Sequence, residues 1–139
     1  MGGFAAVDFA LVHPELYSFV GSLSPSIDMP RRRFNIKRFN QWWRIRTIFG
    51  PFGNTERKAR DPFELVRTAN PQASPYIYLT AGEREPLLEP NRRFEATLKQ
   101  YGFAHEFHTK PGGHDWTEWD AQIPECFESL LKHIPRQSD

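Results

Sequence analysis

The residue with the clearest capacity for acid–base chemistry is His114, which lies in the segment KPGGHDW at 110–116. It follows two glycines between an expected strand end and an expected helix start, and catalytic groups in open α/β sheets lie at the carboxyl ends of strands. Glycines permit a sharp turn that would place the imidazole over the sheet edge. This segment alone leaves two interpretations open: a catalytic histidine, or a structural histidine in a glycine turn.

Two carboxylates are candidate partners for this histidine. Glu83 and Glu85 follow the preceding expected strand. One helix and one strand separate Glu85 from His114, which is the separation that neighbouring parallel strands require. A carboxylate at one strand end and a histidine at the next are the orienting acid and the base of a hydrolytic triad. The alternative is that both glutamates are solvated loop charges.

The elements that must position these residues alternate between helix and strand. The periodicity of apolar residues, together with helix-capping residues and the positions of proline and glycine, predicts strands at 17–23, 76–81 and 103–108. The same signals predict helices at 4–12, after Asp61, from Pro90 to Gly102, at 116–123 and from Pro124. The first helix is expected to be buried. The last is expected to face the core through Cys126, Phe127, Leu130, Leu131 and Ile134. Strands separated by helical crossovers predict a parallel sheet in an α/β fold, and three strands resemble only part of a sheet.

The segment from Met29 to Ala59 is predicted to be the least regular part of the chain. Its stretch at 30–46 contains no acidic residue but seven basic ones: Arg31, Arg32, Arg33, Lys37, Arg38, Arg44 and Arg46. Interleaved aromatic residues make nucleic acid or an anionic substrate a possible ligand. We favour an insert that caps an active-site mouth, with Trp42 and Trp43 lining the acyl or alcohol pocket.

Composition narrows the class of protein. Residues 1–70 hold eleven basic and six acidic side chains, and residues 71–139 hold seven and eleven. No apolar run reaches the roughly 18 residues of a membrane span, and no basic leader opens the chain. The single cysteine, Cys126, excludes an internal disulfide and indicates a reducing compartment, so a cytoplasmic protein is expected. His105 and His108 should face opposite sides of a strand, which argues against a shared metal.

Several segments together resemble the putative-esterase family of α/β-hydrolases. That family includes esterase D (S-formylglutathione hydrolase), tributyrin and carbohydrate-ester esterases, feruloyl esterases and mycolyltransferases. The histidine motif of the family matches GHDW at 113–116, and its acid segment matches YIYL at 76–79 followed by Gly82 and EPLL at 85–88. The start of the helix after the acid resembles NRRF at 91–94. The residues after the nucleophile in the family's G-x-S-M-G-G elbow match MGGFAA at 1–6. The resemblance covers nearly the whole chain, to about Ile134.

The resemblance implies the C-terminal part of an α/β-hydrolase, a cofactor-free serine esterase without a metal that acts on a small-molecule ester. His114 would be its general base and Glu85 its acid, at a position where the family usually has Asp; Glu83 is the fallback. Met1 would supply one oxyanion-hole N–H. The serine would precede Met1 and is absent from this chain.

These inferences predict that the 139-residue chain alone is not a competent esterase. A non-catalytic remnant that acts as a binding module, and a half-enzyme that complements a separate N-terminal half, remain alternatives. The predicted organisation is a partial hydrolase domain at 1–134, with the insert at about 29–60 and a tail at 135–139. Because the strand at 17–23 would lack a neighbour, self-association or pairing with a missing half is expected.

Overall fold

A three-stranded parallel sheet forms the centre of the molecule. The computed structural model describes residues 1–134, so the predicted tail at 135–139 lies outside the described residues. The strands lie in the order β1 (Phe19–Leu23), β2 (Tyr76–Gly82) and β3 (His105–Lys110). Parallel pairing runs from Phe19↔Tyr76 on one side of β2 and from Ile77↔His105 on the other. The predicted short parallel sheet of an α/β fold is confirmed.

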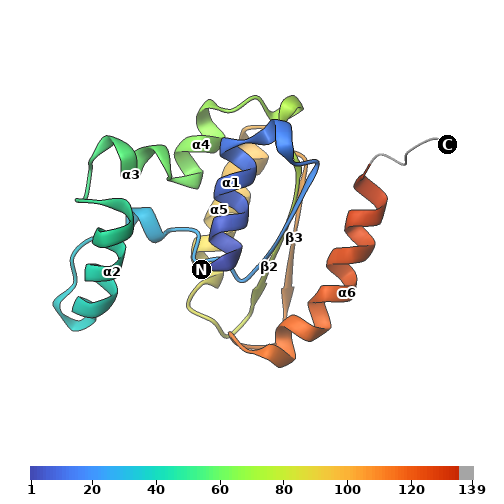
Figure 1. The fold of residues 1–139 in the computed structure, drawn as a ribbon. Helices are drawn as coiled ribbons and strands as arrows, with labels where there is room; N and C mark the ends of the chain where they lie inside the picture. The colour runs from blue at the N-terminus through green and yellow to red at the C-terminus, as the bar shows by residue number, and fades with distance from the viewer. Residues whose placement is uncertain (135–139) are drawn as a thin grey trace.

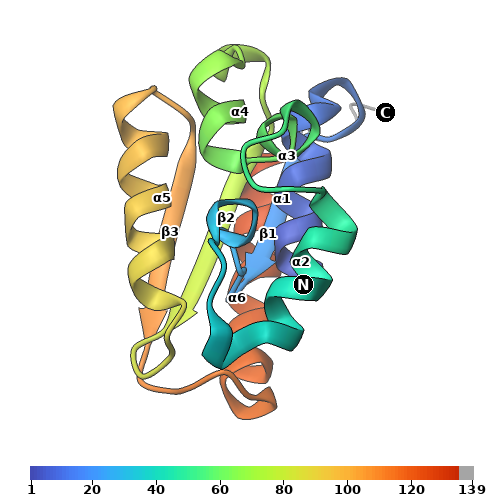
Figure 2. The same cartoon turned by 90° about the vertical axis from the view of Figure 1, so that its left-hand side faces the viewer.

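Helices cover both faces of this sheet, as Figures 1 and 2 show. The helices of more than three residues are α1 (Gly2–Val12), α2 (Phe39–Phe49), α3 (Thr55–Ala59), α4 (Pro62–Thr68), α5 (Leu88–Gln100) and α6 (Trp116–His133). Short 3-10 turns lie at Pro14–Leu16, Met29–Arg31, Ile36–Arg38 and Pro71–Ala73. Helices α1 and α5 pack on one face of the sheet, with α4 against them, and α6 lies on the other face.

Apolar residues of α1, α4, α5, the sheet and the loops next to β1 and β3 form the main core. Its fully buried members include Val7, Ile27, Val66, Ile77, Leu79, Phe94 and Leu98. The prediction that α1 is buried holds for its sheet-facing side, but Phe9 is exposed. The one polar residue within this stretch, Asp8, is buried and accepts a 2.9 Å hydrogen bond from Arg60. Burial raises the pKa of this carboxyl, and the arginine opposes that rise.

Asp61 begins α4 in the way that the sequence predicts. Its side chain accepts a hydrogen bond from the backbone N–H of Phe63 at 3.0 Å, and Pro62 occupies the first helical turn, where a missing N–H costs nothing. Both features are local in sequence, so they are readable without knowledge of the tertiary structure.

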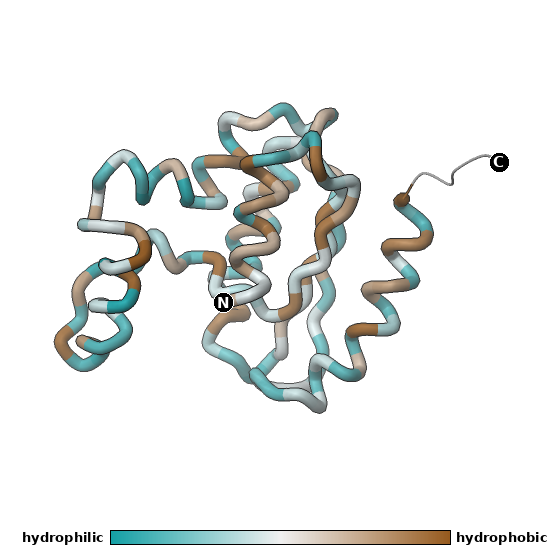
Figure 3. The backbone as a smooth tube through the Cα atoms, in the orientation of Figure 1, coloured by the Kyte–Doolittle hydropathy of each residue, from teal (hydrophilic) through white to brown (hydrophobic). Residues whose placement is uncertain are grey.

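Two expectations for the C-terminal region are wrong. Helix α6 is continuous through Pro124, so that proline does not begin a separate helix. A proline inside a helix removes one hydrogen bond and bends the axis, and Figure 1 shows the orange start of α6 at an angle to the rest. In addition, Phe127 and Leu131 are exposed, because within residues 1–134 no other element covers the side of α6 that faces away from the sheet. Figure 3 shows hydrophobic and hydrophilic residues alternating along this helix.

The basic insert is more regular than predicted, because it contains α2 and α3. Ile45 and Phe49, one helical turn apart, are buried against Phe4 and Met29 in a second small core. This packing holds α2 beside the N-terminus of α1. The Arg57 side chain, buried in α3, donates to the carbonyl oxygens of Pro30 and Arg32 at 2.5 Å each.

The sheet ends at β1 and β3, and within residues 1–134 no further strand pairs with either edge. Ile123, Phe127 and Leu131, at successive helical turns of α6, add an exposed apolar stripe. Pairing with a missing half, self-association and the domain boundaries stay predictions. Within the described part of the chain, no helix combines the length and the hydrophobicity needed to cross a bilayer. The cytoplasmic location also stays a prediction.

Candidate active site

The loops that follow β2 and β3 are joined to each other at the carboxyl edge of the sheet. The last paired residues of the two strands are Gly82 and Lys110. Beyond them, the backbone N–H of Glu83 donates to the carbonyl oxygen of Lys110 at 2.9 Å, and that of Arg84 donates to Gly112 at 2.9 Å. The acid loop and the histidine loop are therefore held together by main-chain hydrogen bonds.

His114 and Glu85 meet across these two loops. The Nδ1 atom of His114 lies 2.7 Å from Oε2 of Glu85. The Glu85 side chain is fully buried, and its other oxygen accepts a hydrogen bond from the backbone N–H of Gly82 at 2.9 Å. The His114 side chain is 47% exposed, and among the described residues its Nε2 atom makes no hydrogen bond. One ring nitrogen is thus anchored and the other is available.

Glu83, the alternative acid, makes no hydrogen bond and no ion pair with His114. Its side chain is exposed, and its only hydrogen bond within residues 1–134 is the backbone contact to Lys110. The ring of His114 instead packs edge-on against Trp119 of α6, with centroids 5.0 Å apart and planes at 88°. A buried carboxylate on one side and an indole on another restrict the orientation of the imidazole.

Glycine at position 82 allows the close approach of the two loops. A Cβ added there would lie 2.8 Å from the carbonyl oxygen of Gly113 and 2.9 Å from that of Gly112. Both are backbone atoms, so the neighbouring loop would have to move as a whole.

Gly82→Ala is expected to destabilise the fold by about 1–3 kcal/mol, because overpacking of this kind shifts the backbone. The measurement is urea denaturation of both proteins. Gly2→Ala is the matched control, since among the described residues no atom outside its own turn of helix lies within 4 Å of the Cβ that it would add. Equal stability of the Gly82→Ala and Gly2→Ala proteins would contradict this account.

His114 opens onto a cavity of about 340 Å³. Four residues of α2, at helical spacing along one face, form part of its wall: Gln41, Arg44, Ile45 and Ile48. Met1, Ser26, Met29, Arg32 and Leu87 complete the lining. Trp42 and Trp43 do not line this cavity, because neighbouring helical residues point about 100° apart. Trp42 borders an adjoining hollow, and Trp43 borders another. The structure therefore brings Met1 to His114 but not the two tryptophans.

Residues 1–130 match the family model described as "Putative esterase". The chain belongs to this esterase family. A curated relative, the acetyl esterase of Caldicellulosiruptor saccharolyticus, is 25% identical over 140 residues, covering 95% of the chain and 52% of the relative. The esterase chain thus spans about half the length of this relative.

Solved structures agree on the fold of the esterase chain. A ferulic acid esterase superposes with a TM-score of 0.74 at 18% identity, covering 96% of this chain and 50% of that one. FphF, a fluorophosphonate-binding serine hydrolase of Staphylococcus aureus, gives 0.72 at 21% identity, with 94% and 51% covered. The fold is accordingly that of part of an α/β-hydrolase.

A polar network behind the histidine loop was not anticipated from the sequence of the esterase. Gln122 donates to Glu118 at 2.5 Å and contacts the Thr80 hydroxyl of β2. Burial, together with the Glu85 and Asp115 carboxylates, raises the pKa of Glu118. Only one contact near this network could be predicted from neighbouring residues in the sequence. The Asp115 side chain caps α6 by accepting a 3.2 Å hydrogen bond from the backbone N–H of Glu118, as expected for an acidic residue three positions before a glutamate at a helix start.

The other titratable candidates of the chain lie away from His114. His105 lies 3.6 Å from Glu95 of α5, whereas His108 packs against Tyr78 on the face of α6, so the two histidines do face opposite sides. Within residues 1–134 no group of three or more His, Cys, Asp or Glu side chains is arranged to hold a metal. Cys126 is half-buried beside Gly21, and burial raises the pKa of its thiol.

Proposed function

We propose that this chain supplies the histidine and the acid of a serine esterase that hydrolyses small carboxylic esters. The observation that carries the proposal is the 2.7 Å contact between His114 Nδ1 and the buried Glu85, with Nε2 left available. The name of the curated relative, acetyl esterase, supports a carboxylic ester as the substrate class. The cavity beside His114 is of the size that small-molecule sites have.

In this proposal Glu85 fixes the tautomer of His114. The Nδ1–H group donates to the carboxylate, which leaves the Nε2 lone pair to take the proton of the attacking serine hydroxyl. The imidazolium formed in this step is stabilised by the negative charge of Glu85. It then gives its proton to the leaving alkoxide, and a water molecule repeats the cycle to release the acid.

The nucleophile in this proposal is the residue that would precede Met1 in the whole protein. Met1 borders the same cavity as His114, and α1 starts at Gly2, so a residue before Met1 would lie at the start of this helix beside the cavity, as the nucleophile does in a strand-to-helix elbow. The backbone N–H of Met1 would then be one oxyanion-hole donor. Reading the coding sequence upstream of Met1 in frame tests this: Gly-x-Ser after an apolar strand is expected, and an unrelated sequence would favour a non-catalytic binding module.

The 139-residue chain by itself is expected not to hydrolyse naphthyl acetate above the rate in buffer. Ser26 is the one serine that lines the cavity, but its hydroxyl accepts a 2.8 Å hydrogen bond from Arg32 and makes none to His114. The measurement is product release by the purified chain, with its Ser26→Ala form beside it. Turnover that disappears in His114→Ala would show that the chain alone is a competent enzyme.

A further inference from the structure

One wall of the His114 cavity carries positive charge that no acidic side chain neutralises. Arg44 of α2 lines this cavity and also borders the hollow beside Trp43, and within residues 1–134 it makes no ion pair and no side-chain hydrogen bond. The lining residues include no Asp or Glu. A guanidinium that borders a site without a protein partner is available to a ligand.

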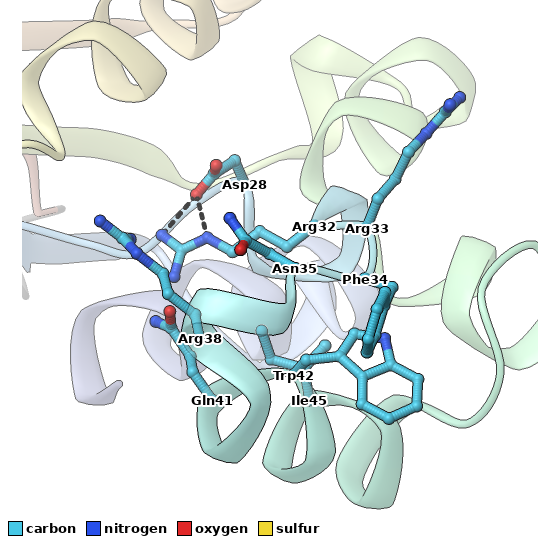
Figure 4. A pocket seen from close by; sticks show the side chains of 9 residues that line it. All are labelled: Asp28, Arg32, Arg33, Phe34, Asn35, Arg38, Gln41, Trp42 and Ile45. Atoms are coloured by element: carbon cyan, nitrogen blue, oxygen red, sulfur yellow. Dashed lines mark hydrogen bonds and ion pairs between the residues drawn. The ribbon is translucent and has the colours of Figure 1, made fainter.

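A second arginine of the wall is held in place. Arg32 donates to Asp28 through Nε at 3.2 Å and through its terminal nitrogen at 2.8 Å, and that nitrogen also reaches the Ser26 hydroxyl at 2.8 Å. Figure 4 shows both of these contacts, which end on the same Oδ1 atom of Asp28, at the edge of a hollow formed by the insert. The pair neutralises the charge of Arg32 and fixes its position, so Arg44 carries the uncompensated charge.

The hollow in Figure 4 extends the cavity along α2. It measures about 460 Å³ and shares Arg32, Gln41 and Ile45 with the His114 cavity. Arg38 adds a further guanidinium that pairs with no acid within residues 1–134, and Asp28, already paired with Arg32, is the only acid of the lining. The charge therefore continues from the His114 cavity into the insert.

We infer that the ester bound at His114 carries a carboxylate in its non-reacting part and that Arg44 binds this group. The inference rests on the proposed function and adds the substrate class. A guanidinium presents two parallel N–H donors that match the two oxygens of a carboxylate, and such charge-assisted pairs are stronger than neutral hydrogen bonds. Gln41, one turn before Arg44 on the same face, offers an amide donor to the same group.

Matched esters in the whole protein test this inference. The first pair, 4-acetoxybenzoate and its methyl ester, places the charge in the alcohol part. The second pair, monomethyl and dimethyl terephthalate, places it in the acyl part. The anionic member of at least one pair is expected to have the higher kcat/KM. The ratio of anionic to neutral ester is expected to fall about 10- to 100-fold in Arg44→Gln, which is the effect of losing a charge-assisted contact.

Arg46→Gln is the matched control, because it removes the same charge from the same helix. Arg46 lies over Trp42, 5.7 Å from the ring centroid, and does not line the His114 cavity. Its substitution is expected to leave the ratio within about two-fold, since only screened long-range charge is lost. An equal fall in both variants, or no preference for the anion in either pair, would overturn the inference.

Binding of the products separates this inference from the proposed function, because binding needs no turnover. Calorimetry of the products 4-hydroxybenzoate and terephthalate is expected to show tighter binding than that of their neutral amides, which an esterase does not hydrolyse, with the difference lost in Arg44→Gln. If this preference is found but no ester is hydrolysed, the anion site stands and the esterase proposal fails. If esters are hydrolysed but neither product shows the preference, the anion site is wrong.

Discussion

Replacing His114 with alanine is expected to lower kcat/KM for ester hydrolysis by the whole protein about 10⁴- to 10⁶-fold, the range found when a triad base is removed. The substitution deletes the group that takes the serine proton and returns it to the leaving alkoxide. It also leaves the buried Glu85 without its 2.7 Å partner. The measurement is steady-state hydrolysis of an acetate ester, with circular dichroism to verify folding.

His108→Ala is the control for this experiment. His108 lies on β3, six residues before His114, and its ring is 2.7 Å from Glu106 and partly exposed. It does not line the His114 cavity, so its loss is expected to change kcat/KM less than about three-fold. A His114→Ala protein that folds and keeps more than about a tenth of the activity would exclude His114 as the catalytic base.

Replacing Glu85 with glutamine is expected to lower kcat about 10²- to 10⁴-fold, by analogy with acid-to-amide changes in other triads. The change keeps the size of the side chain but removes its charge. An amide can donate to Nδ1 of His114, which would favour the tautomer with hydrogen on Nε2, the form that cannot accept the serine proton. The imidazolium formed during the reaction would also lose its stabilising carboxylate.

Glu83→Gln is the matched control, because it makes the same chemical change two residues away on the same loop. The Glu83 side chain is exposed and makes no hydrogen bond with His114, so activity within about two-fold of the original is expected. Comparison of kcat for the two variants decides which carboxylate orients the imidazole. A larger loss in Glu83→Gln than in Glu85→Gln would assign that role to Glu83.

The meeting of Glu85 with His114 was predictable from the sequence, because it follows from topology. A β-branched and aromatic run at 76–81 and an alternating apolar and polar segment at 103–108, separated by one helix, favour neighbouring parallel strands. The carboxyl ends of such strands share one edge. Residues directly after the two strands therefore lie close together, as the 2.7 Å contact shows. The cap at Asp61 was predictable for a similar reason, since donor and acceptor are two residues apart.

The burial of individual side chains could not be predicted from the sequence, because it depends on which surfaces meet in the folded protein. Periodicity predicts an apolar face on α6, but the core covers only what packs against it, so Phe127 and Leu131 remain exposed.

The sequence determined the fold class, the strands and the loops that carry His114 and Glu85, because short-range patterns and strand order fix them. Only the tertiary structure decided that Arg44 and Gln41, and not Trp42 and Trp43, line the cavity. The rotation of α2 about its axis is set by Ile45 and Phe49 packing on Phe4, a contact between segments some 40 residues apart that no local pattern encodes.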